Sequence, residues 1–501
     1  MSNMDTMDPP AGAPPAAADA GLKQGLSLLD AVMLVSGSMI GSGIFIVSAD
    51  IARQMGSAGG LLLVWVATGL MTLAAALSYG EMAAAMPRAG GQYVFLREGL
   101  GRLFGFLYGW TLFLVIQTGT IAAVAVAFAR FLGVFIPEVN DRIFLPMGKL
   151  PMPGGSVELG LSPQRVVGIV IIVLLTWVNL RGLREAKWIQ TSFTIAKTGA
   201  LAALILLGIT IGRNADAIAA NFGSLWAGDP AQTVPTSFLG ITLPIMVTAF
   251  GMAMVGSLFS ADAWNNVTFA AAEVRRPERN LPLALALGTG LVTVLYVLAN
   301  VAYLSVLSLA EIKGAPQDRV GTLALQHMFG DVGQYLMAGA ILVSTFGCIN
   351  GLILAGARVY FAMARDGLFF EKAGMVSPRN VPAWALVAQG VWTALLTLTG
   401  TYGQLLDYVI FAALIFYVLT MMALFRLRKL RPDLPRPYKA FGYPVVPALY
   451  LLSALGIALI LLVAKPVYSF SGLFVVLLGI PVYVLWSRGE AARASEARSR
   501  L

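Results

Sequence analysis

Long apolar runs separated by short polar or basic connections make up most of the chain. A membrane-spanning helix needs about 20 consecutive, mostly apolar residues. Runs of about that size lie near positions 28–52, 61–86, 103–136, 164–180, 188–212, 235–271, 282–308, 333–364, 382–399, 404–427, 446–464 and 469–487. The pattern therefore predicts an all-α integral membrane protein with twelve transmembrane helices.

A glycine- and serine-rich stretch interrupts the first of these runs. Positions 37–45 read Gly-Ser-Met-Ile-Gly-Ser-Gly-Ile-Phe, and each glycine inside a helix costs roughly 0.5–1 kcal/mol relative to alanine. Backbone groups freed from a helix within a bilayer are tolerated only where they line a polar cavity. The stretch is therefore either half of an amino acid binding site, with amides for a carboxylate and carbonyls for an ammonium, or a small-residue face for close helix packing.

The sixth run contains a matching interruption. Positions 255–266 read Val-Gly-Ser-Leu-Phe-Ser-Ala-Asp-Ala-Trp-Asn-Asn, which places small and polar groups in the middle of an apolar run. Two interrupted helices five apart are typical of two inverted five-helix repeats with a binding site between them at the bilayer midplane. We expect the first repeat over 26–215, the second over 216–430, and helices 11 and 12 within 431–487. The correspondence favours a transport site over simple packing.

Two ionisable residues near the middle of apolar runs are candidates for function. Asp262 is either a functional carboxylate or a cap for the second half of the interrupted sixth helix. Lys197 lies about 14 Å along its helix from Trp188, at ~1.5 Å per residue, which is near the middle of a ~30 Å hydrocarbon core. An ammonium at that depth needs carbonyl or carboxylate partners, and the exposed carbonyls of the interrupted first helix could supply them. Lys197 is then a fixed cation where other transporters hold a sodium ion, or a structural tether between helices 1 and 5.

Composition agrees with the membrane assignment. Of the 501 residues, 58% are hydrophobic and 12% are charged, against about 25% charged residues in soluble domains. A single cysteine, Cys348, excludes an internal disulfide, and a single histidine, His327, leaves no His/Cys metal cluster. We therefore expect no metal and no cofactor.

The basic residues indicate the orientation of the chain. The net charge is +9, and most of the 34 Lys and Arg residues lie in the tails and in the connections on the side of the termini. Cytoplasmic connections of membrane proteins carry this excess. Both tails, a disordered segment over 1–25 and a polar segment over 488–501, are predicted to be cytoplasmic, in a multi-pass protein of the inner membrane. Nucleic acid is not an expected partner.

Several motifs in consistent order resemble the amino acid–polyamine–organocation superfamily of permeases, and within it the bacterial members of the L-amino acid transporter branch. The resemblance covers about 26–453. Its motifs are the glycine-rich 37–45, Pro-Arg-Ala-Gly-Gly-Gln-Tyr-Val at 87–94, the sixth-helix break at 259–265 followed by Glu273 and 277–282, Phe-Gly-Cys-Ile-Asn-Gly at 346–351, and Arg-Pro-Tyr at 436–438.

The resemblance implies a fold of two inverted five-helix repeats plus two peripheral helices, with helices 1 and 6 discontinuous. It implies a site in which the substrate carboxylate meets the amides around Gly41, Ser42 and Gly43. The substrate ammonium would meet the carbonyls of Ile40, Phe259, Ser260 and Asp262. Phe259 falls where the branch places an aromatic gate, Lys197 matches the fifth-helix lysine of sodium-independent members, and Ser344 and Cys348 lie on helix 8 beside the site.

The chain departs from the branch in two places. The branch reads aromatic-Asp/Gly-Gly-Trp in the sixth helix, and this chain reads Ala-Asp-Ala-Trp over 261–264, which changes the local shape and the expected substrate range. Metazoan members join a glycoprotein through a cysteine in the outer loop after helix 3. The loop here, 137–163, has no cysteine, so we expect no disulfide-linked heavy chain.

The sequence therefore predicts a sodium-independent carrier that moves neutral L-amino acids by alternating access, as an exchanger, and not an enzyme. A proton-coupled symporter that uses Lys197 is an alternative. A cationic amino acid or polyamine antiporter is another, suggested by Asp262. A membrane-embedded enzyme would need clustered nucleophiles, bases or metal ligands, and a channel would need rings of pore-lining polar groups; neither pattern stands out in the sequence.

Overall fold

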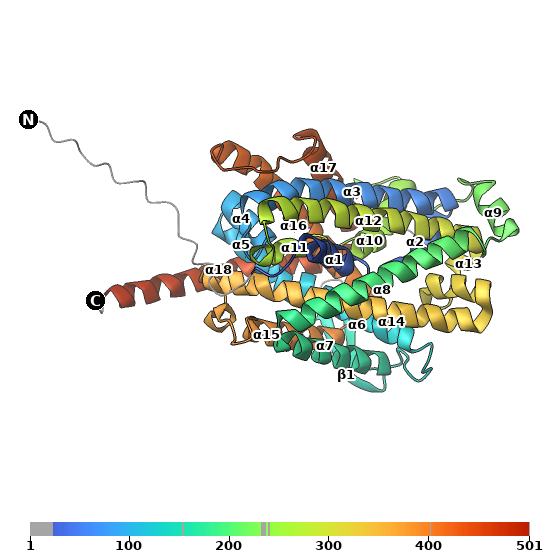
Figure 1. Cartoon of the computed structure of the whole chain (residues 1–501), viewed down its shortest axis with the longest axis horizontal. Coiled ribbons are helices and arrows are strands. Elements are labelled where there is room, and N and C mark those ends of the chain that lie inside the picture. The colour runs from blue at the N-terminus through green and yellow to red at the C-terminus, as the bar shows by residue number, and fades with distance from the viewer. Residues whose placement is uncertain (1–23, 153–154, 232–236, 239–240, 401, 500–501) are drawn as a thin grey trace, which may run out of the picture.

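The computed structural model describes residues 24–499 apart from 153–154, 232–236, 239–240 and 401. Its helices run along the long axis of an elongated bundle (Figure 1). The end of α18 and the short helices α4 (Gln92–Leu100) and α5 lie at one end of the bundle, and α9 (Ala215–Phe222) and α13 (Leu309–Lys313) lie at the other.

Within the described residues, nine helical segments are long and apolar enough to cross a membrane. They are α3 (Ala58–Ala85), the composite span Arg102–Leu132, α7 (Pro163–Arg181), α8 (Leu183–Ile209), α12 (Pro277–Val306), α14 (Val320–Arg365), α16 (Tyr402–Leu430), α17 (Val445–Ala464) and α18 (Pro466–Ser499). The composite span joins α5 (Arg102–Thr111), a π-helical turn η2 (Leu112–Ile116) and α6 (Gln117–Leu132). Helix α14 is kinked at Phe329 and Gly330.

The first predicted break is present. Helix α1 (Leu28–Met39) and helix α2 (Gly43–Met55) are bent by 41° across three intervening residues, and together they form a tenth candidate span. Ser27 begins α1 with a capping box, in which its side chain accepts from the amide of Asp30. The glycine-rich stretch is therefore an interruption of the helix.

The sixth predicted run is also broken. Helix α10 (Ile245–Ser260) ends at Ser260, and the chain becomes helical again only at the single turn α11 (Asn266–Phe269), followed by the 3-10 turn η3 (Ala271–Glu273). Between them Ala263 has a φ of 64°, a left-handed conformation that costs an L-residue about 1–2 kcal/mol. Helix α10 and α15 (Ala383–Thr397) are apolar but shorter than the other spans.

The two broken spans lie inside a ring of long helices. Helix α2 packs on α10, and α1 packs on α12, α8 and α14. Helices α3 and α12 lie side by side along much of their length (Figure 1). This packing places the unwound residues of both spans in the interior.

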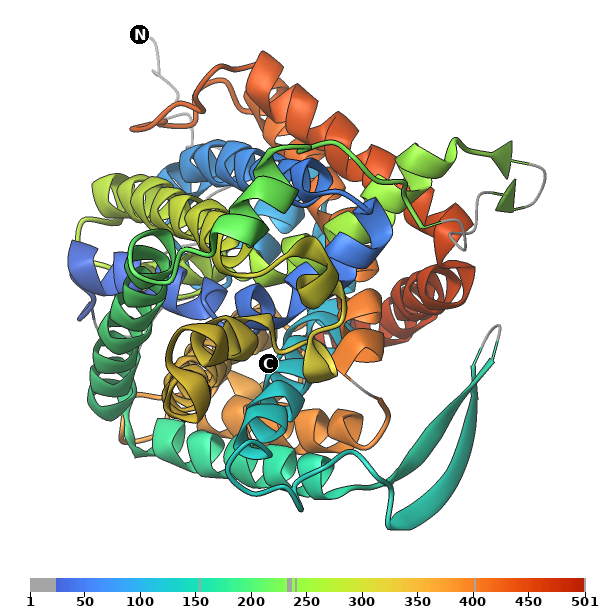
Figure 2. The same ribbon diagram turned by 90° about the vertical axis from the view of Figure 1, so that its right-hand side faces the viewer.

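The end of the bundle near α9 and α13 carries the described strands. An antiparallel hairpin of β1 (Leu145–Met152) and β2 (Gly155–Leu161) extends from its edge (Figure 2). A small pairing of β3 (Ser237–Phe238) with β4 (Ile241–Thr242) and the turn η4 (Pro316–Asp318) also lie among these connections. The sequence predicts an exposed loop over 137–163, and the hairpin is a structured addition to an otherwise helical protein.

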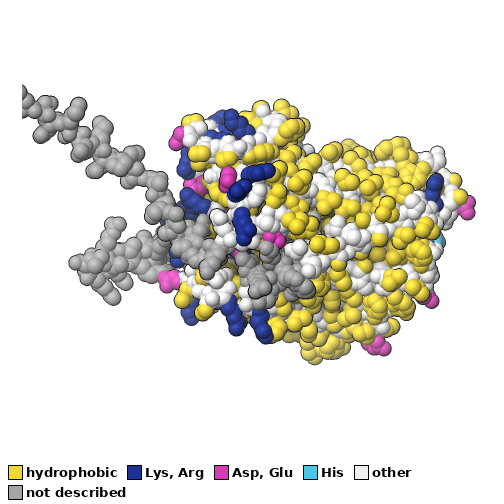
Figure 3. Space-filling model, viewed as in Figure 1, with side chains coloured by type: hydrophobic (Ala, Val, Ile, Leu, Met, Phe, Trp, Pro, Cys, Tyr) yellow, Lys and Arg dark blue, Asp and Glu magenta, His cyan; other side chains and the backbone are white. Residues whose placement is uncertain are grey.

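The end near α4 and α18 is the basic one. Lys and Arg side chains gather there on the face shown in Figure 3, whereas hydrophobic side chains cover the rest of that face broadly.

Glu273, after the second break, is held by buried contacts. The buried Arg358 donates to both carboxylate oxygens of Glu273, at 2.7 and 3.2 Å. The segment before α1 is tied to the same place, because the amide of Leu26 donates to the carbonyl of Glu273 and that of Arg275 to the carbonyl of Leu26, both at 2.9 Å. Another 3-10 turn, η5 (Glu371–Gly374), follows α14.

Candidate substrate site

The two breaks meet at small residues. A Cβ placed on Gly43, at the start of α2, would lie 2.7 Å from the Cβ of Ser260 and 3.0 Å from its Cα. A Cβ on Gly41 would lie 3.1 Å from the Sγ of Cys348 on α14. Glycine at position 43 therefore allows the first and sixth spans to approach closely, and glycine at position 41 allows the first span to approach α14.

The amides predicted to bind a carboxylate lie at a helix start. Ser42 is the N-cap of α2, which begins at Gly43. The first amides of an α-helix have no partner within the helix and carry the positive end of its dipole. Ser42 is buried, and its hydroxyl lies 3.5 Å from the hydroxyl of Tyr402 on α16. A carboxylate at this position would meet the backbone donors of Gly41, Ser42 and Gly43.

Lys197 supplies a buried cation to the same break. Its ammonium donates to the carbonyls of Gly37, Ile40 and Ser344, at 2.6 Å for Ile40 and 3.3 Å for Ser344. The side chain is 1% exposed. The predicted use of carbonyls from the first broken helix is confirmed, and one side chain of α8 thereby holds α1 and α14. The geometry is compatible with both the fixed-cation and the tether interpretations.

Ser344 and Cys348 of α14 also face the break. The hydroxyl of Ser344 lies 3.3 Å from the carbonyl oxygen of Ile40 and 3.1 Å from that of Gly41, and the thiol of Cys348 lies 3.1 Å from the carbonyl of Ser38. These contacts hold the unwound carbonyls in place on the side of α14. Both residues therefore lie beside the site that the sequence predicts.

Tyr296 of α12 joins the two breaks and is a residue that the sequence interpretation missed. Its hydroxyl lies 2.9 Å from the carbonyl oxygen of Met39, where α1 ends, and 3.0 Å from that of Ser260, where α10 ends. Its ring packs edge-to-face on Trp65 at 5.3 Å. In an apolar run such as 282–308, a tyrosine cannot be distinguished from an ordinary core aromatic.

Phe259 packs against a second aromatic that the sequence did not single out. Its ring meets that of Tyr402 edge-to-face, with centroids 5.9 Å apart and planes at 86°. Phe259 is 6% exposed. Tyr402 therefore contacts both Phe259 and Ser42, and so touches one residue from each broken span. The role of Phe259 as a gate stays a prediction.

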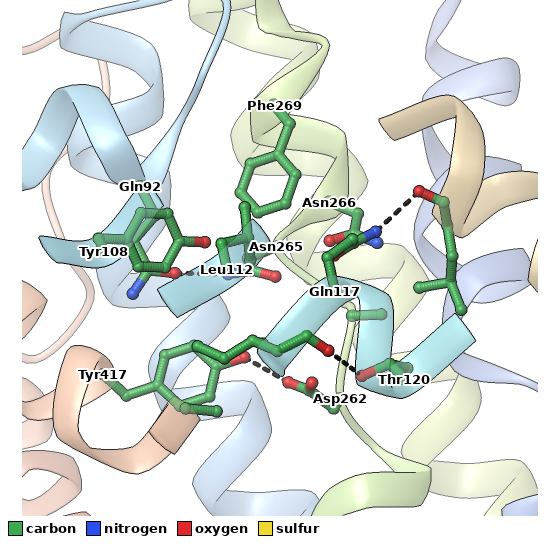
Figure 4. Close-up of a pocket in the computed structure, with 14 residues that line it drawn as sticks. Gln92, Tyr108, Leu112, Gln117, Thr120, Asp262, Asn265, Asn266, Phe269 and Tyr417 are labelled. Carbon is green, nitrogen blue, oxygen red and sulfur yellow. Dashed lines mark hydrogen bonds between the residues drawn. The ribbon is translucent and has the colours of Figure 1, made fainter. Parts of the chain in front are cut away.

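Asp262 does not cap the second half of the sixth span. The N-cap of α11 is Asn265, and no side-chain capping bond is present there. The chain stays non-helical beyond Asp262 because Ala263 takes its left-handed conformation. The carboxylate of Asp262 instead accepts a hydrogen bond from the hydroxyl of Tyr417 on α16, and the two side chains point toward each other (Figure 4).

Asp262 lines a small polar cavity between α6, α11 and α16. The cavity has a volume of about 10 Å³, which is close to the smallest space that holds a water. Asn265 donates to Gln92 at 2.8 Å, and Gln92 donates to Thr420 at 3.0 Å. Asn266, at the start of α11, also lines the cavity (Figure 4), and its side-chain nitrogen is buried without a partner in the structure. Gln92 lies in the 87–94 motif, but its contact with Asn265 could not be predicted from that motif.

Two interrupted spans that bring backbone donors and acceptors together inside a bundle of apolar helices define a membrane transporter of the alternating-access type. A family model described as amino acid permease matches residues 26–485. The chain belongs to this amino acid permease family, whose members are transporters and not enzymes.

Curated relatives align over nearly the whole chain. The serine/threonine exchanger SteT of Bacillus subtilis is 31% identical over 95% of this chain and 99% of its own length. The large neutral amino acids transporter small subunit 2 of Homo sapiens is 31% identical over 93% of this chain and 80% of its own length. The human Asc-type amino acid transporter 1 is 28% identical over 93% of this chain and 82% of its own length.

Proposed function

We propose that this permease is a sodium-independent exchanger of neutral L-amino acids. The observation that carries the proposal is the ammonium of Lys197 on the carbonyls of Gly37 and Ile40. A protein cation held at unwound carbonyls provides the positive charge that a bound sodium ion would otherwise supply there. Three relatives support the same substrate class, since they are a large neutral amino acids transporter subunit, an Asc-type amino acid transporter and a serine/threonine exchanger.

The two breaks together suit a zwitterion. The amides at the start of α2 face a carboxylate with the positive end of a helix dipole. The carbonyls at the end of α10, from Phe259 to Asp262, present the negative end of another helix and suit an ammonium. The affinity for an amino acid then comes from backbone groups, and the side-chain surroundings set which amino acids fit.

The finer architecture belongs to the same proposal. The nine long spans, the bent pair and the two shorter apolar helices α10 and α15 together would make the twelve spans that the sequence predicts, arranged as two inverted five-helix repeats and two peripheral helices. The basic end in Figure 3 would then face the cytoplasm, with both termini on that side of the inner membrane. We further propose that the chain works without a heavy-chain partner.

Asp262 supports a second candidate, transport of cationic amino acids or polyamines. Its carboxylate is buried beside Asn265 and Asn266 and lines the cavity between α6, α11 and α16. The hydrogen bond from Tyr417 weakens this candidate, because it already satisfies one carboxylate oxygen. Proton-coupled symport through Lys197 is a variation in the coupling ion, not in the substrate.

The test is uptake of radiolabelled amino acids into proteoliposomes that contain the purified protein. The exchanger requires that uptake of L-serine or L-alanine rise severalfold when the vesicles hold unlabelled amino acid, and that replacing sodium with choline change nothing. Uptake that ignores the internal amino acid and follows an inward proton gradient would refute exchange. Competition by arginine and putrescine, but not by alanine, would refute the neutral substrate class.

A further inference from the structure

A second cavity lies on the other side of Tyr402 from the breaks. It has a volume of about 260 Å³ and is lined by Arg130, Arg165, Tyr402 and residues of the β1–β2 region. Small-molecule pockets commonly hold roughly 300–1,000 Å³, so this space suits a ligand of amino acid size. It lies toward the face that carries the hairpin (Figure 2), opposite the basic end.

The cavity presents charges of both signs. Asp141 and Glu158 line it together with Arg130 and Arg165. The guanidinium of Arg165 is already engaged, since its Nη1 donates to the carbonyls of Gly160 at 2.7 Å and Leu398 at 2.8 Å. Arg165 therefore has a structural role in the wall of the cavity, and Arg130 is the better candidate to bind a ligand.

Arg130 keeps most of its donors. Among the described residues its side chain donates one hydrogen bond, from Nη1 to the carbonyl of Gln317 at 3.3 Å, out of the five N–H groups of a guanidinium. Its guanidinium lies over the ring of Tyr402, 5.6 Å from the centroid. A planar guanidinium with free N–H groups binds a carboxylate well.

A second arginine strengthens the positive potential there. Arg319, at the cap before α14, donates to the backbone carbonyl of Arg130 at 2.6 Å. Burial, together with the nearby positive charge of Arg130, lowers the pKa of Arg319 to about 10. Its Nε is buried and has no hydrogen-bond partner among the residues that the structure describes. An incoming anion would relieve the repulsion between the two guanidinium groups.

We propose that this cavity is an outer staging site, in which the carboxylate of a zwitterionic amino acid binds Arg130 and its ammonium binds Asp141. Tyr402 lies between this site and the central one, since its ring contacts both Arg130 and Phe259 and its hydroxyl contacts Ser42. Movement of one aromatic side chain then joins the two sites. The inference rests on the proposed function, because it assumes an amino acid substrate.

The test counts the molecules of radiolabelled L-serine that bind to the purified full-length protein at saturation. We expect two per chain in the wild type, one in Arg130→Gln and one in Asp141→Asn. The matched controls are Arg142→Gln and Glu138→Gln, which alter charges of the same segment outside the cavity lining, and both should still bind two. Gly43→Ala should leave the outer site intact and weaken the central one about tenfold, and its combination with Arg130→Gln should bind serine only at that weakened central site.

Two further readings make the test specific. Arg130→Gln should still exchange amino acids, with a KM for external substrate raised severalfold, which also reports that the variant is folded. Acetate, which has a carboxylate but no ammonium, should compete poorly at the outer site. One serine per wild-type chain with exchange intact would overturn the staging site alone, as would equal competition by acetate. Absence of binding and transport for every neutral amino acid would instead overturn the proposed function.

Discussion

The ammonium of Lys197 lies 2.6 Å from the carbonyl oxygen of Ile40, at the point where the first span is unwound. This contact joins α8 to the break and neutralises the negative end of α1, whose last carbonyls have no partners within the helix. Because the ammonium is buried, the contact is shielded from water and from salt. Lys197 therefore contributes, with Ser344 and Tyr296, to holding the carbonyls of the proposed substrate site in place.

Replacing Lys197 with alanine should abolish or strongly weaken transport. Hydrogen bonds from a charged group contribute about 1.5–3 kcal/mol each, so we expect a loss of about tenfold or more in exchange rate. Exchange by purified protein in proteoliposomes measures the effect, and the yield of monodisperse protein controls for insertion. Lys197→Met keeps the length and removes the charge; wild-type exchange by that variant would contradict an electrostatic role.

Gly43→Ala should weaken substrate binding. The added methyl group would press on the Cβ and Cα of Ser260, and overpacking of this kind costs about 1–3 kcal/mol. Binding of labelled amino acid at equilibrium measures the loss, for which we expect about tenfold. Gly199→Ala and Gly290→Ala are matched controls, because a Cβ at either position meets, apart from its own helix backbone, no atom of the described residues within 4 Å. Equal losses in all three variants would argue against a specific approach of α2 to α10.

Tyr296→Phe tests the hydroxyl that joins the two breaks. The ring, with its contact to Trp65, is kept, and the carbonyls of Met39 and Ser260 lose a buried donor. An unsatisfied buried group costs about 1–3 kcal/mol, so the melting temperature in detergent should fall, and exchange should slow. Tyr335→Phe, at an exposed tyrosine of α14, is the control. An unchanged melting temperature and exchange rate for Tyr296→Phe would show that these two hydrogen bonds contribute little to stability or to transport.

Ala263→Gly should stabilise the protein. The left-handed conformation of Ala263 costs about 1–2 kcal/mol, and glycine removes that cost. Glycine also loses more conformational entropy on folding, which offsets about 0.5–1 kcal/mol of the gain. We expect a net gain of up to about 1 kcal/mol, seen as a higher melting temperature. Ala261→Gly is the matched control: Ala261 has a φ of −92°, so glycine there should lower the melting temperature. A lower melting temperature for Ala263→Gly would contradict the inference that Ala263 is strained.

Strong local patterns made part of the fold and site predictable. The glycines of 37–45 are poor helix formers in an apolar run, and Lys197 lies too deep to reach water, so both the break and the carbonyl partners of the lysine followed from elementary chemistry. Tyr296 and Tyr402 were missed because an aromatic side chain in an apolar run reads as packing. What makes these two tyrosines part of the site is their contact with residues far away in the chain.

Two other features were beyond sequence reasoning for physical reasons. The β1–β2 hairpin contains Pro146, Gly148 and Pro151, residues that disfavour strands and hide the alternation of a hairpin. Asp262 was expected to cap a half-helix, because an acidic residue after a break is a common helix start. The conformation of Ala263 delays the helix to Asn266, and a left-handed alanine leaves no trace in the sequence.

The pairing of Leu26 with Glu273 and Arg275 has a mechanical consequence. It fastens the lead-in to α1 onto the exit from η3, while Arg358 clamps Glu273 from α14. Because these contacts tie α1 to η3, and through Arg358 to α14, we expect a movement of one broken span at this end to carry the other with it. Such coupling would keep one span from moving alone and leaving an open path for solute.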